Sequence, residues 1–106
     1  MAVSIKSMNS AVTVTQTAFL TATKPTVITG GLVSNTGTGE AAISVLHKKS
    51  AGSTAHVVKS ASIPQGSALT FAGGDIPKLN LEVGDQILAN FATAATGDII
   101  ISYLET

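Results

Sequence analysis

The side chains that could carry chemistry in this chain are two histidines and a few carboxylates. His47 and His56 flank a predicted hairpin loop, Lys48–Thr54, so they could face each other and hold a metal ion between two imidazoles. A metal site needs a third ligand, and no sequence argument places Glu40 or Asp75 near the histidines. We therefore expect surface or half-buried histidines and predict no metal site.

Four of the carboxylates in the C-terminal third are Asp75, Glu82, Asp85 and Asp98. Two of them could form a pair for general acid–base catalysis. Each, however, sits beside a glycine or at a turn, where aspartate commonly caps local backbone amides. The sequence therefore favours capping roles over catalytic ones.

Other possible sites also have simpler explanations. Gly30–Gly31 and the pair Gly37 and Gly39 are not followed by a helix whose N-terminus could hold a phosphate, so we interpret them as turn glycines. No serine has the histidine and acid arrangement of a nucleophile. The four aromatic residues are too few for a stacking platform and are expected in the core: Phe19, Phe71, Phe91 and Tyr103. We predict a non-enzymatic protein with no catalytic residues and no cofactor.

Period-two alternation predicts strands throughout the last third of the chain. Leu79, Leu81 and Val83 alternate with polar residues, as in a strand with one buried face. In the run Asp98–Leu104, apolar residues occur on both faces, which indicates a central or doubly covered strand. Ile63–Ser67 places a proline and a glycine two residues apart between apolar runs, which predicts a tight turn.

The remaining chain also reads as short strands separated by turns. Two short strands are expected before Phe19, and a third over Thr26–Ser34 with a bulge or bend at Gly30–Gly31. Ala41–Lys48 and Ala55–Ile63 predict an antiparallel hairpin. The expected fold is all-β: a single antiparallel β-sandwich, jelly-roll or immunoglobulin-like, with about eight short strands and essentially no helix.

A chain of 106 residues fits one domain overall. We expect residues 1–25 to form an N-terminal extended arm or the first strands, with a possible contact segment, and residues 26–106 to form the sandwich body. The predicted core consists of apolar residues on the inner side of period-two runs: Ile43, Val45, Leu69, Leu81, Ile87, Phe91, Ile99 and Ile101. Ile101→Ala is expected to be costly and Lys78→Ala to be nearly neutral.

Charge argues for association and against several partner classes. Charged residues make up 11% of the chain, six acids balance six bases, and there is no cysteine. The lysines are dispersed and arginine is absent, so no nucleic-acid partner is expected. The segment Met1–Met8 lacks the apolar core of a signal peptide, and no apolar run is long enough for a membrane span, so no membrane partner is expected. A neutral, charge-poor surface favours a homo-oligomer, and Thr13–Thr29 is the predicted pairing segment.

Three turns occur in a distinctive order. Val33–Gly37 reads VSNTG, Ile63–Leu69 reads IPQGSAL, Leu81–Ile87 reads LEVGDQI, and the chain ends with ISYLE over Ile101–Glu105. This order resembles small virion structural proteins of tailed bacteriophages, and the resemblance covers Thr26–Glu105. It implies a non-enzymatic virion protein, above all a capsid decoration or cement protein.

Within the virion, the resemblance implies binding to the major capsid protein or other virion proteins, a homotrimer on capsid three-fold sites, and assembly in the host cytoplasm. The alternatives are a neck or tail component of the virion and, in another class, a carbohydrate-binding or adhesin module, because fold alone does not decide function.

Overall fold

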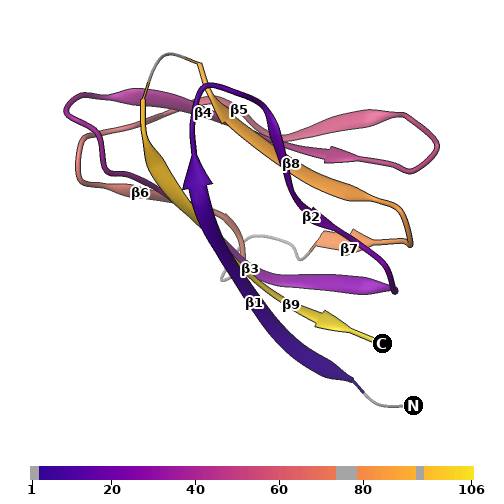
Figure 1. Ribbon diagram of the computed structural model, residues 1–106. Coiled ribbons are helices and arrows are strands. Elements are labelled where there is room, and N and C mark those ends of the chain that lie inside the picture. Colours follow the sequence, from indigo (N-terminus) through magenta and orange to yellow (C-terminus); the bar gives the residue numbers. More distant parts are fainter. Residues whose placement is uncertain (1–2, 74–78, 93–94) are drawn as a thin grey trace.

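The computed structural model describes residues 3–73, 79–92 and 95–106, and this part of the chain forms nine strands and no helix (Figure 1). The strands are β1 (Ser4–Val12), β2 (Thr17–Thr21), β3 (Thr26–Asn35), β4 (Ala41–Lys48), β5 (Thr54–Ile63), β6 (Ala68–Ala72), β7 (Leu79–Leu81), β8 (Gln86–Phe91) and β9 (Gly97–Glu105). Within the same residues, no helix has the length and apolar character of a membrane span. The expected all-β sandwich is confirmed.

The strands form two antiparallel sheets. One has the order β1-β9-β3-β6, with β7 also paired to β3, and the other has the order β2-β8-β4-β5. The chain crosses from one sheet to the other after β1, β2, β3, β5, β7 and β8. Because β6 and β7 occupy the same side of β3, they act as two parts of one edge, and the order is then that of a jelly roll. Of the two sandwich types expected, the jelly roll is the one observed.

The core lies between the two sheets and consists mainly of β-branched and aromatic side chains. Seven of the eight predicted core residues are buried: Ile43, Val45, Leu81, Ile87, Phe91, Ile99 and Ile101. Leu69 is half-buried, because it lies on β6 at the edge of its sheet. Lys78, the expected neutral position, lies outside the described residues.

Two glycines shape the middle of β3. Register shifts occur between Ile28 and Gly30 and between Gly31 and Leu32, which confirms the expected bulge. A Cβ atom at Gly31 would overlap the ring of Phe71, which is 1% exposed. At Gly30 the nearest atom to such a Cβ would be Ser102 Cβ at 3.9 Å. Gly31 is therefore the glycine that lets the largest core side chain of β6 pack against the backbone of β3.

The side chain of Asn35, at the end of β3, holds two turns together. Its Nδ2 donates to the carbonyls of Gly39 at 2.8 Å and Ile63 at 2.9 Å, and its Oδ1 accepts from the Gly37 N–H at 3.0 Å. In the second turn the Ser67 N–H donates to the Pro64 carbonyl at 3.0 Å. The tight turn expected from the proline and glycine spacing is confirmed.

The first 25 residues supply two strands of the sandwich. β1 pairs with β9 over nine consecutive residue pairs, and β2 pairs with β8 in the other sheet. Residues Ser4–Val12 and Thr17–Thr21 of this segment therefore lie in the two sheets.

Candidate functional site

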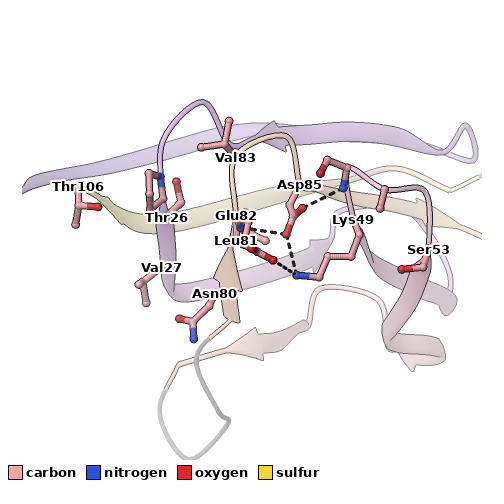
Figure 2. A pocket seen from close by; sticks show the side chains of 13 residues that line it. Thr26, Val27, Lys49, Ser53, Asn80, Leu81, Glu82, Val83, Asp85 and Thr106 are labelled. Atoms are coloured by element: carbon pink, nitrogen blue, oxygen red, sulfur yellow. Dashed lines mark hydrogen bonds and ion pairs between the residues drawn. The ribbon is translucent and has the colours of Figure 1, made fainter.

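Asp85 is the most highly connected ionisable residue among those described. It lies between β7 and β8 with 1% exposure. Its carboxylate accepts the Ser50 N–H at 3.0 Å and the Glu82 N–H at 3.1 Å. The ring nitrogen Nε2 of His47 lies 3.2 Å away and Nζ of Lys49 3.3 Å away. Figure 2 shows the carboxylate directed at Lys49 and at the backbone of the Glu82 turn.

The contacts of Asp85 set its charge state. Burial on its own would raise the pKa of Asp85, but the N–H groups of Ser50 and Glu82, followed by His47 and Lys49, outweigh burial. The net result is that the pKa of Asp85 lies well below the ordinary value of 3.8. A carboxylate whose pKa lies far below neutral pH is a weak general base, because it binds a proton too weakly.

Asp85 and its partners His47, Lys49, Ser50 and Glu82, the Asp85 cluster, hold two turns of the sandwich together. The cluster connects the turn after β4, which carries Ser50, to the turn between β7 and β8. Gly84 in the second turn has a φ of +93°, and a Cβ atom there would lie 2.7 Å from Ser50 Cβ. The predicted capping role is thus confirmed at Asp85, and the glycine beside it allows the two turns to approach closely.

The two histidines do not face each other. In the β4–β5 hairpin Leu46 lies opposite His56, so His47 and His56 point to opposite faces of the sheet. His47 contacts Asp85, whereas His56 is exposed. The described residues contain no group of three histidine or carboxylate side chains that could hold a metal ion.

The other predicted carboxylates are scattered, with one exception. Glu82 Oε1 lies 2.8 Å from Lys49 Nζ, so the structure brings Glu82 and Asp85 together around one ammonium group. The hydrogen bond to Glu82 is the main reason that the pKa of Lys49 is raised. The side chain of Glu82 is 81% exposed. Asp98 lies exposed within β9 rather than in a turn, and Asp75 lies outside the described residues.

A groove of about 940 Å³ lies beside the Asp85 cluster (Figure 2). Its walls are Pro25, Thr26, Val27, Lys49, Ser50, Ala51, Ser53, Asn80, Leu81, Glu82, Val83, Asp85 and Thr106. Its charged side chains are already bonded to one another, and none of these lining residues is a histidine that could activate Ser50 or Ser53. The groove therefore lacks a nucleophile–base pair.

The second candidate is the outer edge of β1. β1 keeps an unbroken register with β9 from Ser4 to Val12, and its other side pairs with no strand of the described chain. An unpaired strand edge carries a row of free N–H and C=O groups that can accept another strand.

The other sheet edges are irregular or short. β2 has five residues and a register shift between Ala18 and Leu20. β5 has two register shifts against β4, and Ser60 has a φ of 51°. β6 and β7 have five and three residues. Bulges and short length are two of the features by which edges avoid pairing, and among the described strands β1 is the edge that lacks both.

The predicted pairing segment, Thr13–Thr29, includes the edge strand β2 (Thr17–Thr21) and also reaches a strand that is not at an edge. Its last part, Thr26–Thr29, belongs to β3, which lies between β9 on one side and β6 and β7 on the other. That backbone has no free edge. Threonine content reports β-propensity, which a central strand also needs, so the signal did not distinguish a central strand from an edge.

The outer face of the β1 sheet is poor in charge. Cross-strand neighbours Ile5, Leu104 and Val27 form one row on this face, and Asn9, Ile100 and Leu32 form another. Ile5 is 84% exposed and Ile100 is 45% exposed. The described residues that share this face are Ile5, Ser7, Asn9, Ala11, Val27, Leu32, Ser34, Ala68, Thr70, Asn80, Asp98, Ile100, Ser102 and Leu104, and Asp98 is the one charged residue among them.

Comparisons with known proteins give a likeness of fold. No family model matches the chain, and no curated protein matches it. Among solved structures, a chain from Bacillus endospore appendages, described as a novel family of disulfide-linked pili, is similar with a TM-score of 0.60 and 15% identity. The match covers 99% of this chain and 87% of the appendage chain. The two proteins share a fold, and the present chain has no cysteine.

Proposed function

We propose that this protein is a non-enzymatic structural subunit that assembles with copies of itself on a larger particle. The observation that carries the proposal is the regular, unpaired edge of β1 beside an outer sheet face with one charged residue among those described. Soluble monomers normally guard such an edge with charge, proline or a bulge. The one charged residue of β1, Lys6, is paired with Glu105 of the same chain, so we take the edge to be available for main-chain pairing, as an assembling subunit requires.

We propose a non-enzymatic role because the charged side chains beside the groove are already bonded to one another. Asp85, Lys49 and Glu82 satisfy one another beside the groove, and the hydrogen-bond donors on Asp85 lower its pKa. A general acid or base works best when its pKa lies near the working pH. Charged groups that are already bonded to one another therefore suit a structural role better than a catalytic one.

For the particle, we propose a virion of a tailed bacteriophage, with the protein as a capsid decoration or cement protein. The support is the sequence resemblance of its three turns, together with the structural roles of those turns. Asn35 joins the first turn to the second, and Asp85 caps the third. A neck or tail position in the same virion is the alternative placement.

A second candidate is a subunit of a surface appendage, which the fold of the Bacillus appendage chain favours. A fibre of the present chain would have to be held without disulfides, because the chain has no cysteine. A carbohydrate-binding module is the third possibility, for which the groove beside Asp85 would be the sugar site; the groove has no aromatic residue among its lining side chains.

The three candidates can be separated with one preparation of the purified chain. Electron microscopy of the chain alone, and of the chain mixed with phage shells that lack their accessory proteins, is the main measurement. The decoration proposal predicts discrete oligomers alone and regular density on the shells. Long fibres without shells would support the appendage candidate, and binding on a glycan array without shell binding would support the sugar-binding module. Either result would contradict the decoration proposal.

A further inference from the structure

We infer that β1 pairs with β1 of a second copy of the same chain, antiparallel and about a two-fold axis. The two β1 sheets would then form one continuous sheet. This inference rests on the proposed function and names the partner that its open edge takes.

The geometry of β1 suits a long strand partner. Nine consecutive residues keep one register against β9, so the backbone of β1 is regular along its whole length. A second strand can therefore form an uninterrupted antiparallel ladder with it. A ladder against β2, β5 or β6 would meet a register shift or end after five residues.

The charges of β1 also suit a copy of itself. Lys6 is the one charged residue in Ser4–Val12, and its Nζ lies 2.7 Å from Glu105 Oε1 of the same chain. Glu105 is also the main reason that the pKa of Lys6 is raised. Two copies can thus meet at this edge with their lysines already paired.

We place the two-fold axis at Met8, the middle residue of β1, because all nine residues of the strand then pair. Met8 packs against the core, and Ser7 and Asn9 lie on the outer face. A two-fold axis at Met8 places Ser7 of each copy opposite Asn9 of the other, and Ile5 opposite Ala11, which keeps outer-face residues together. Lys6 then faces Ser10. An axis at Lys6 would instead place two lysines directly opposite each other, which destabilises a strand pair.

This contact also accounts for an exposed apolar residue. Ile5 is 84% exposed in the single chain, and a neighbouring strand from a second copy would cover part of its side chain. A two-fold contact uses the same surface on both copies and closes without open-ended growth. It replaces the three-fold arrangement implied by the capsid resemblance with an even-numbered one.

Charge-swap variants test both the partner and the register. In S7K/N9K each lysine faces a lysine of the other copy, and in S7E/N9E each glutamate faces a glutamate. Each variant alone should raise the dimer dissociation constant about tenfold over wild type at low salt. An equimolar mixture, and the variant S7K/N9E alone, should dimerise at least as tightly as wild type. Sedimentation velocity over a concentration series provides the constants.

The matched control carries the same added charge at the far edge of the same face. A68K/T70K lies on β6, so it should leave the dissociation constant unchanged. Circular dichroism and thermal unfolding of each variant establish that it is folded. Within one chain, the cross-strand neighbours of Ser7 and Asn9 are Ser102 and Ile100, which carry no charge that would repel or attract the new side chains.

The possible failures are distinguishable. Equal dissociation constants for wild type and S7K/N9K would overturn the β1 pairing but not the proposed assembly. A wild-type trimer whose dissociation constant is the same in all the charged variants would do the same. Equal weakening by A68K/T70K would also overturn the β1 pairing. A wild type that is monomeric throughout, alone and with shells, would overturn both proposals.

Discussion

Gly30 and Gly31 are adjacent in β3, yet the surroundings of a side chain differ sharply between them. An alanine at Gly31 would push into the ring of Phe71 in a packed core, so we expect Gly31→Ala to lower the free energy of unfolding by about 1 to 3 kcal/mol. Gly30→Ala should change it by less than about 0.5 kcal/mol. Urea unfolding of both variants makes the comparison. Equal losses would mean that Phe71 does not pack on Gly31.

Asp85 should make the protein sensitive to acid. A carboxyl group with a depressed folded-state pKa contributes stability above its ordinary pKa of 3.8, and this contribution is lost as the pH falls through that value toward the folded-state pKa. Asp85→Asn should therefore have a lower melting temperature than wild type at pH 7. The difference between the two proteins should shrink between pH 5 and about pH 3.

Thermal unfolding at several pH values measures this difference. Asp98→Asn, at an exposed position in β9, is the control and should melt like wild type at pH 7. If Asp85→Asn and wild type lose stability in parallel on acidification, the carboxylate is not held by the contacts described.

Some residue roles could be predicted from sequence and others could not. Capping by Asp85 was predictable, because an aspartate next to a glycine in a turn has a local partner, here the Glu82 N–H. Its contact with Ser50 was not, because the two residues are 35 positions apart. Asn35 begins the NTG motif of a turn that the sequence shows, but its bond to the Ile63 carbonyl depends on two turns meeting in space.

Within an element, β9 offers a direct test of which face is inside. Ile101 is fully buried and Ile100 is 45% exposed, although they are neighbours with the same side chain. Ile101→Ala should cost about 2 to 5 kcal/mol of unfolding free energy through lost burial and a cavity. Ile100→Ala should cost less than about 1 kcal/mol. Denaturant unfolding at one protein concentration compares them, and similar costs would mean that the register of β9 is wrong.

Strands and hairpins could be predicted well from the sequence, because alternation, glycine and proline act locally. The Ala41–Lys48 and Ala55–Ile63 hairpin and the bulge in β3 are examples. The position of a strand within its sheet could be predicted less well. Residues Asp98–Leu104 were correctly expected in a central strand, but Thr26–Thr29 were expected at an edge and lie in the interior of a sheet.

Pairing order was not accessible from one sequence, because it depends on contacts between distant segments. β1 pairs with β9, the two ends of the chain, and this pairing leaves the other side of β1 open. The candidate interface is therefore a product of the topology. Composition indicated that association was favoured, and the strand order leaves β1 as the long, regular edge on which we propose it.

At the scale of the whole molecule, we propose that the chain is a subunit held to its copies by main-chain pairing and apolar contact. Sedimentation velocity of the wild-type protein at micromolar concentration, in low and in high salt, tests this most directly. Such a contact should persist in high salt, because salt screens charges and leaves hydrogen bonds and apolar burial in place. We predict a self-associated species in both conditions. A stable monomer in both conditions would contradict self-assembly through main-chain pairing and apolar contact.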